Sequence, residues 1–241
     1  MSGTRPTRLR WGCTVKAEDR ARGRKRAPAE NRVQREIVAW LWVILAFLFI
    51  NGTLVQARVI PSGSMERTLL IGDHLIMSRF GYDAGIPFTH WHVPLWRNPH
   101  RQEIVIFRPP ANPDASDLVK RVIGLPGDVV EIHDGSVWIN GKKLAEPYLK
   151  EPMDPRERSG PYFVPMNSYF VMGDNRNNSY DSRYWGFVPR SSIIGTPVII
   201  YMSIRGPEEA WQGQIRERLF AYANALIHPG LVRWRRLFLT F

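Results

Sequence analysis

Residues 129–144 read VVEIHDGSVWINGKKL, and this stretch decides the fold class. Apolar and polar residues alternate along it, interrupted by two dipeptides, Asp134-Gly135 and Asn140-Gly141. Both dipeptides favour the tight two-residue turns that join antiparallel strands, because their residues tolerate positive φ angles. The stretch therefore predicts three consecutive antiparallel strands.

Segments on either side of this stretch also favour strands. EIVIFRPP (103–110) is a β-branched run that ends at two prolines, and SYFVMGD (168–174) and GTPVIIYMS (195–203) add two further strands. No segment between residues 59 and 205 shows a helical period of comparable strength. We therefore expect a mainly β, antiparallel domain over residues 58–205, with irregular stretches at 81–102 and 150–165.

An apolar run, IVAWLWVILAFLFINGTLVQA (37–57), precedes this domain and contains no charged residue. As a helix it would be about 31 Å long, which is enough to cross the hydrocarbon core of a bilayer. Trp40 and Trp42 near its start are typical of the membrane interface. The run predicts a retained transmembrane helix. A cleaved signal peptide is the alternative, since Val55-Gln56-Ala57 suits cleavage, but the run exceeds the usual length of roughly 7–15 apolar residues.

Positive charge is concentrated before the apolar run. The chain has a formal net charge of +11, and residues 1–36 hold eleven Lys/Arg against four Asp/Glu. By the positive-inside rule, residues 1–36 form a cytoplasmic tail. The prediction is a single-pass protein of the inner (cytoplasmic) membrane, with its β domain on the periplasmic or extracytoplasmic side. An organelle-targeting peptide is the alternative for the tail, and Glu18 and Asp19 disfavour it.

Several ligand classes are disfavoured by the same sequence. No zinc-finger or RNA-recognition pattern accompanies the basic tail, so we expect no nucleic-acid partner. Cys13 is the only cysteine, which rules out an internal disulfide and a cysteine metal framework. His90 and His92 have no third ligand at useful spacing. We predict no metal site and no cofactor.

Three segments carry the candidate chemistry: PSGSM (61–65), KRVIGLPGD (120–128) and MGDNRNNSYDSRYWGFVP (172–189). A serine hydroxyl needs a base to become a good nucleophile. No histidine lies in these segments, which disfavours a Ser-His-Asp arrangement and leaves Lys120 as the available base. Apolar neighbours could desolvate the Lys120 ammonium and lower its pKa toward neutrality. From the residues alone, an ordinary outward-facing strand lysine remains the better interpretation.

Together with the preceding apolar run, the three segments resemble the bacterial type I signal peptidase family, in the family's order and at similar spacing. The resemblance covers about residues 36–205, plus the ending VRWRRLF (232–238). It implies that Ser64 is the nucleophile and Lys120 the general base. Ser62 and the backbone N–H of Ser64 would stabilise the oxyanion, and Ser179 would orient the lysine amine. Four residues would be structural: Gly173, Asn175, and the ion pair of Asp181 and Arg183.

The resemblance also implies a reaction and partners. It implies a serine endopeptidase that removes signal peptides from exported preproteins at the outer face of the membrane, with a signal-peptidase or SOS-repressor-like β domain. Residues flanking Ser64 and strand residues 118–130 would line shallow pockets for small side chains, with the substrate added as a strand. The lipid bilayer is the second partner. The C-terminal segment 206–241 could lie at the membrane interface, because VRWRRLFLTF (232–241) combines aromatic and cationic residues. The segments 87–96 and 183–187 share this composition, but packing inside the domain explains them equally well.

Two other functions remain as alternatives. A self-cleaving repressor-type peptidase also uses a Ser-Lys pair, but that type lacks the anchor and the Gly-Asp-Asn-Arg segment. A non-catalytic membrane adaptor would have no need for intact Ser64 and Lys120.

The sequence departs from the family pattern at three places. Arg67 stands where proline is usual, Asn177 where aspartate is common, and Arg101-Gln102-Glu103 where Arg-Gly-Asp is usual. We therefore expect a less constrained turn after Met65 and one fewer carboxylate near residue 177.

Overall fold

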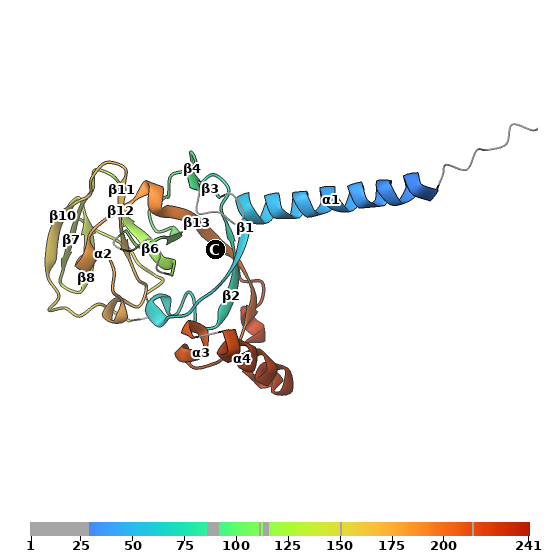
Figure 1. Cartoon of the computed structure of the whole chain (residues 1–241). Coiled ribbons are helices and arrows are strands. Elements are labelled where there is room, and N and C mark those ends of the chain that lie inside the picture. The colour runs from blue at the N-terminus through green and yellow to red at the C-terminus, as the bar shows by residue number, and fades with distance from the viewer. Residues whose placement is uncertain (1–28, 86–91, 111, 113–115, 150, 214) are drawn as a thin grey trace, which may run out of the picture. The chain divides into compact units, whose positions relative to one another are not determined.

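A computed structural model describes residues 29–85, 92–110, 112, 116–149, 151–213 and 215–241, and it confirms the predicted fold class. It contains an N-terminal α-helix and a domain built mainly of antiparallel strands (Figure 1). The chain divides into two compact units, Met1–Ile44 and Leu45–Phe241. Most of the predicted cytoplasmic tail, residues 1–28, lies outside the described residues.

Helix α1 (Ala29–Thr53) covers most of the predicted membrane span. Its segment Arg32–Ile50 has a mean hydropathy of 1.9 and is long and apolar enough to cross a membrane. The helix ends at Thr53 rather than at residue 57, and Val55–Val59 forms strand β1 instead. Asn51, Gly52 and Thr53 are poor helix formers, which explains the early end.

The strands are named in chain order. They are β1 (Val55–Val59), β2 (Asp73–Ser78), β3 (Asp83–Gly85), β4 (His92–Pro94), β5 (Ile104–Phe107), β6 (Leu118–Gly124), β7 (Val129–His133), β8 (Ser136–Ile139), β9 (Lys142–Lys143), β10 (Ser159–Phe163), β11 (Ser168–Met172), β12 (Val188–Pro189) and β13 (Ile193–Ser203). The remaining α-helices are α2 (Ser182–Trp185), α3 (Glu208–Gln212) and α4 (Ile215–Ile227). Short 3₁₀ helices are η1 (Gly63–Met65), η2 (Arg176–Asn178), η3 (Arg190–Ser192), η4 (Pro229–Leu231) and η5 (Trp234–Arg236).

The strands form three antiparallel sheets. The largest has the order β1-β2-β13-β5-β6-β11-β12, so β1 lies at one of its edges. A four-stranded sheet has the order β10-β7-β8-β9, and β3 pairs with β4. Strands β5 and β6, distant from β1 in the chain, therefore occupy the middle of the large sheet.

The two predicted turns of the 129–144 stretch are present. Asp134 and Gly135 have φ angles of 54° and 66°, and Asn140 and Gly141 have 51° and 75°. Positive φ at both central residues is the geometry of the type I′ turns that close two-residue hairpins. The prediction of three consecutive strands, β7, β8 and β9, is confirmed.

Two stretches that were expected to be irregular contain strands. Residues 150–165, expected to be irregular, contain β10, which pairs with β7 through Tyr162 and Val130. Gly160-Pro161 hides this strand in the sequence, because proline cannot donate to a strand ladder. Residues 81–102 contain the short pair β3 and β4. Residues 118–130 are two strands, β6 and β7, separated by a turn at Gly127, whose φ is 86°.

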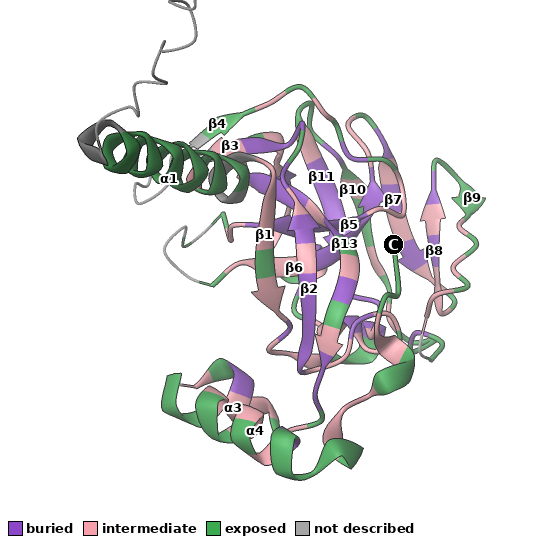
Figure 2. Cartoon of the chain, turned by 90° about the vertical axis from the view of Figure 1, so that its right-hand side faces the viewer, coloured by how far each residue is buried: buried purple, intermediate pink, exposed green. Residues whose placement is uncertain are grey.

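The buried residues that form the core concentrate along the strands (Figure 2). One cluster joins the four-stranded sheet to β6 and β11; it contains Ile123, Val130, Ile132, Val137, Ile139, Met153, Val164, Phe170 and Met172. Packing of these side chains against the four-stranded sheet holds one face of β6 in place. A second cluster, which includes Ile60, Met65, Leu69 and Ile106, packs beneath the segment that follows β1.

The C-terminal residues 206–241 belong to the β domain rather than forming a separate segment after residue 205. Trp211 of α3 is fully buried and packs with Ile204 and Ala225. The chain then returns along β13, and Ile199 bridges to Thr240. Isolated short helices are marginal in water, so tertiary contacts of this kind are what hold α3 and α4 in place.

Buried Asp73 makes the strongest polar connection between this segment and the sheet. Its carboxylate is 0% exposed and pairs with Arg236 at 2.6 Å. It also accepts hydrogen bonds from the Ser203 hydroxyl at 2.6 Å and from the Leu70 N–H at 2.8 Å. These partners satisfy a charge that would otherwise be costly to bury.

Replacing Asp73 should destabilise the domain. Asp73→Ala removes the carboxylate that compensates the mostly buried Arg236 guanidinium and leaves that group with its bond to the Thr68 carbonyl. We expect a loss of about 3–5 kcal/mol in the free energy of unfolding. Urea unfolding of the detergent-solubilised chain measures it. Asp134→Asn is the control, because asparagine also tolerates the φ of 54° at this turn position and the exposed ion pairs of Asp134 with His133 and Arg158 should contribute little. Equal unfolding midpoints for the two variants would contradict the assigned role of Asp73.

Candidate active site

Ser64 lies in the single 3₁₀ turn η1 that follows β1. The buried side chain of Met65 anchors this turn, and the Leu69 N–H donates to the Met65 carbonyl at 2.8 Å. Asn175, from the third motif, donates its backbone N–H to the Ser64 carbonyl at 3.0 Å and its side-chain amide to the Gly63 carbonyl at 3.1 Å. Two distant segments thus fix the backbone that carries the Ser64 hydroxyl.

Lys120 reaches Ser64 from the middle of the large sheet. It lies on β6 opposite Val105 of β5, and its side chain is almost fully buried at 3% exposure. Its Nζ lies 2.6 Å from the Ser64 Oγ. The structure therefore brings together the predicted nucleophile and base, which lie 56 residues apart in the chain.

Burial lowers the pKa of the Lys120 amine from its ordinary value of 10.5 to about 8. Desolvation is the largest cause, because removing water disfavours the charged form. The Asp181 and Asp174 carboxylates act in the opposite direction and raise the pKa, while the Arg183 guanidinium lowers it. A substantial fraction of the amine is consequently neutral at mildly alkaline pH.

Gly173 is required by a close approach of three segments. A Cβ at this position would lie 2.3 Å from the Ser179 hydroxyl and 2.5 Å from the Ser64 carbonyl oxygen. Real side chains essentially never approach so closely, so glycine lets the third motif pass directly behind η1. The lack of space for a Cβ thus explains why position 173, predicted to be structural, is a glycine.

Ser179 lies against Gly173, but the predicted hydrogen bond to the lysine is not formed. The Ser179 hydroxyl is buried and has no hydrogen-bond partner among the residues that the structure describes. A buried hydroxyl without a partner is costly, and each such group calls for an explanation. Because the Ser179 hydroxyl lies close to the Ser64 backbone, it is a hydrogen-bonding group that the site does not use in this structure.

Asp181 and Arg183 form the expected ion pair. The Arg183 guanidinium donates to the fully buried Asp181 carboxylate at 2.8 and 2.9 Å, and Asp181 also accepts the Gly173 N–H at 3.0 Å. Arg183 further pairs with Glu157 and donates to the Arg176 carbonyl. The pair therefore holds both ends of the 173–183 loop behind the serine.

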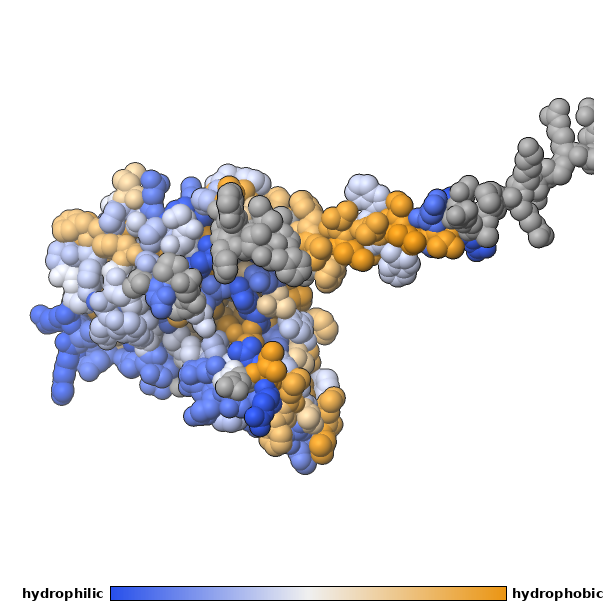
Figure 3. Space-filling model, in the orientation of Figure 1, coloured by the Kyte–Doolittle hydropathy of each residue, from blue (hydrophilic) through white to orange (hydrophobic). Residues whose placement is uncertain are grey.

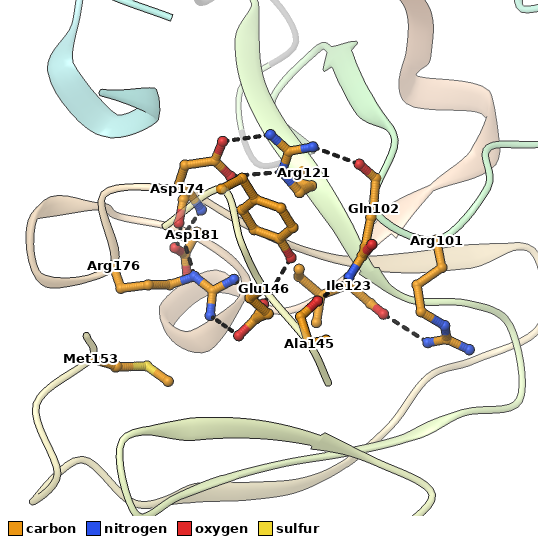
Figure 4. A network of polar contacts seen from close by, with 12 residues as sticks. Arg101, Gln102, Arg121, Ile123, Ala145, Glu146, Met153, Asp174, Arg176 and Asp181 are labelled. Carbon is orange, nitrogen blue, oxygen red and sulfur yellow. Dashed lines mark hydrogen bonds and ion pairs between the residues drawn. The ribbon is translucent and has the colours of Figure 1, made fainter. Parts of the chain in front are cut away.

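A second polar network, which sequence reasoning missed, braces the same loop (Figure 4). Arg121, the neighbour of Lys120 on β6, pairs with buried Asp174 at 2.6 Å. Arg176 pairs with Glu146 and donates to the Gly173 carbonyl at 3.0 Å. The only signal in the sequence was Arg121 within the apolar strand 118–124; nothing in the polar segment 172–189 indicated that Asp174 and Arg176 would be buried.

Two departures from the family pattern have local explanations. Arg67 has a φ of 86°, which proline cannot adopt because its ring fixes φ near about −65°. The Arg67 guanidinium donates to the Leu149 carbonyl, so the turn is held by another contact. The Asn177 side chain accepts from the Asp154 N–H and donates to the Pro152 carbonyl, both at 3.2 Å. A carboxylate could not make the second of these bonds.

A cavity of about 720 Å³ opens beside Ser64 and Lys120. Ser62, with an extended backbone, lies on its wall together with Ser64 and Lys120. The remaining lining residues come from β1 and the loop after it, from β5, from the start of β6, and from α3 and α4: Ala57, Arg58, Val59, Ile60, Pro61, Met65, Ile106, Ser116, Asp117, Leu118, Val119, Trp211, Gln212 and Arg218. Because β1 is an edge strand, its free side offers backbone groups to an extended peptide.

The described residues contain no group of three His, Cys, Asp or Glu side chains placed to hold a metal ion. Of the two histidines considered for a metal site, His90 falls outside the described residues. The groups that line the cavity include the hydroxyls of Ser62 and Ser64 and the buried amine of Lys120.

Comparison with known proteins identifies a family for this chain. Residues 33–202 match the model of the family described as signal peptidase, peptidase S26. A signal peptidase I from Leptolyngbya laminosa is 42% identical, with 68% of this chain and 76% of that protein covered. A probable signal peptidase I-2 from Synechocystis sp. is 39% identical, with 75% and 78% covered. A solved signal peptidase I from Enterococcus faecalis is 38% identical, covering 42% of this chain and 97% of that one, with a TM-score of 0.37. The chain belongs to the signal peptidase family, peptidase S26.

Proposed function

We propose that this protein removes signal peptides from exported preproteins by a Ser-Lys mechanism, without a metal or cofactor. The observation that carries the proposal is the 2.6 Å contact between the Lys120 Nζ and the Ser64 Oγ at a cavity that opens beside an edge strand. The contact has the length needed for proton transfer from the hydroxyl to the amine. The family membership supports the substrate, since the relatives are signal peptidases.

The first half of the reaction uses Lys120 as the base. Neutral Lys120 accepts the Ser64 hydroxyl proton as Oγ attacks the carbonyl carbon of the scissile bond. The resulting oxyanion is stabilised by the Ser62 hydroxyl and the Ser64 backbone N–H. The lysine ammonium then gives its proton to the leaving amine, which departs as the N-terminus of the mature protein.

The second half releases the signal peptide. An acyl group joins the signal peptide to the Ser64 Oγ, and Lys120 takes a proton from a water that attacks this ester. Collapse of the second tetrahedral intermediate returns the proton to Ser64. A base that works in both directions needs a pKa near the working pH, and the lowered pKa of about 8 supports this role.

Ser179, Gly173, Asn175, Asp181 and Arg183 position this pair. The unpartnered Ser179 hydroxyl is available to bind the amine when the Ser64 proton is in transfer. Asn175 and Gly173 hold the Ser64 backbone, and the Asp181–Arg183 pair holds Gly173.

The protein is, in this proposal, anchored in the cytoplasmic membrane by α1, with the tail inside and the catalytic domain outside. The apolar segment Arg32–Ile50 and the preceding basic residues support the orientation. The C-terminal segment would touch the same bilayer. Figure 3 shows hydrophobic residues gathered where α4 lies in Figure 1, and Phe220 and Leu226 of α4 are 75% and 84% exposed. Exposed apolar side chains of this density are typical of interfacial helices.

Removing the amine should abolish cleavage without unfolding the domain. Lys120→Met fills a similar volume but accepts no proton, and Lys120→Arg stays protonated, so both should be inactive. Lys120→Met should also unfold at higher denaturant near pH 7. A folded pKa of about 8 against the ordinary value of 10.5 lowers the free energy of unfolding by about 3 kcal/mol below pH 8. This cost declines between pH 8 and 10.5, where the folded amine is neutral and the unfolded one is still protonated, and it is gone only above pH 10.5.

The pH profile of the wild type tests the same group. The rate of peptide cleavage should rise through pH 8 and level off above it, because the neutral amine is the active form. Kinetics between pH 6 and 10 and urea unfolding measure the two effects. Substantial turnover by Lys120→Met or by Lys120→Arg would exclude Lys120 as the base.

The two serines should behave differently. Ser64→Ala removes the attacking atom, so cleavage should fall to background. Ser62→Ala keeps the nucleophile and deletes one oxyanion donor, which should lower kcat by about a hundred- to a thousandfold with little change in KM. Ser62→Thr retains the hydroxyl and should keep more activity. Steady-state kinetics on one preprotein peptide, with folding checked by circular dichroism, measure this. Near-normal kcat for Ser62→Ala would reduce Ser62 to a loop residue.

The proposed orientation predicts a protease-protection pattern. A protease added to intact spheroplasts should digest the domain after α1 and spare the basic tail. Lysed spheroplasts are the control, in which both parts become accessible. Protection of the β domain in intact spheroplasts would overturn the orientation.

A further inference from the structure

One wall of the active-site cavity comes from α3 and α4, and the proposed mechanism does not use it. Trp211, Gln212 and Arg218 line this wall. The Gln212 side-chain amide donates to the Pro61 carbonyl at 3.3 Å, which joins α3 to the segment just before Ser62. Because Trp211 is fully buried, the wall has a fixed position relative to the catalytic pair.

Arg218 differs from the other charged residues of the cavity in its partners. Arg58 pairs with Asp117, and Lys120 contacts Ser64. Arg218 donates from Nη2 to the Trp211 carbonyl at 3.0 Å, and its Nε, like that of Arg58, is buried without a hydrogen-bond partner among the described residues. Within the described part of the chain, none of the ion pairs includes Arg218.

The charge of the cavity wall is consequently positive when Lys120 is neutral. Arg58 and Asp117 cancel one another, which leaves the Arg218 guanidinium uncompensated. A buried guanidinium nitrogen without a partner is unfavourable, and a carboxylate is the group that matches its planar donors best. A peptide in the cavity can supply such a carboxylate from an aspartate or glutamate side chain.

We propose that Arg218 is a specificity residue that binds an acidic side chain of the preprotein close to the scissile bond. This inference rests on the proposed function, because it assumes that the substrate peptide occupies the cavity at Ser64. The C-terminal helices would then contribute to substrate specificity. The competing role is a purely structural one, in which Arg218 ties α4 to the end of α3 through the Trp211 carbonyl.

Matched peptides separate the two roles. A model preprotein peptide is made in pairs that carry Asp or Asn at one position, scanned over the three residues on each side of the scissile bond. The full-length detergent-solubilised enzyme should prefer Asp over Asn at one position by about tenfold in kcat/KM, the lower end for a charge-assisted hydrogen bond. In Arg218→Gln that ratio should fall to about one.

Arg216→Gln provides the matched control. Arg216 is an exposed arginine on the same helix and is not among the residues that line the cavity. The Asp/Asn ratio of this variant should equal that of the wild type. A charge reversal, Arg218→Glu, should prefer Lys over Asp at the selected position.

Three results would overturn the proposal. These are an Asp/Asn ratio near one at every position in the wild type, a ratio that persists in Arg218→Gln, and equal loss of the ratio in Arg216→Gln. A uniform loss of rate with the ratio preserved would establish the structural role. Should the wild type cleave none of the peptides, the proposed function fails. In that case the affinities of labelled Asp and Asn peptides are compared by fluorescence anisotropy on two inactive variants, Ser64→Ala and Ser64→Ala/Arg218→Gln. Tighter binding of the Asp peptide to the first variant alone would still support the role of Arg218.

Discussion

The structure of the site depends on keeping one amine out of water. Lys120 is 3% exposed, and burial is the main reason why its pKa falls to about 8. Desolvating an ammonium is unfavourable, so the surrounding fold must supply the free energy through packing. Strand β6 can do so because it lies in the middle of the large sheet, with β5 and β11 on its two sides and a core cluster packed on one face. An edge strand would leave the same lysine hydrated and protonated.

The sequence was sufficient to predict what depends on local patterns and on motifs. The turns at Asp134-Gly135 and Asn140-Gly141, the apolar helix and the mainly antiparallel domain are local, since each follows from residue types at fixed spacing. The proximity of Ser64 and Lys120 was expected from the family resemblance alone. The apolar neighbours of Lys120 along β6 do not by themselves distinguish a buried lysine from an exposed one.

What the sequence could not predict depends on contacts between distant segments. Strand β10 was missed because Gly160-Pro161 reads as a loop, and its pairing with β7 decides its conformation. The partners of Arg121 and Arg176, Asp174 and Glu146, are likewise set by tertiary structure. The same holds for the C-terminal helices. Nothing in residues 206–218 indicates that Trp211, Gln212 and Arg218 would line the cavity at Ser64.

The carboxylates around Lys120 explain why so many arginines surround this site. Asp181 and Asp174 hold the loop behind Ser64, but each also raises the Lys120 pKa by stabilising the ammonium. Unopposed, two buried carboxylates would keep the amine protonated and inactive as a base. Arg183 pairs with Asp181 and lowers the Lys120 pKa, and Arg121 pairs with Asp174. The arginines therefore let the protein use buried aspartates to position the serine loop while the amine remains able to accept a proton. The ion pairs Asp181–Arg183 and Asp174–Arg121 are accordingly buried behind the loop, and none of these four residues lines the cavity.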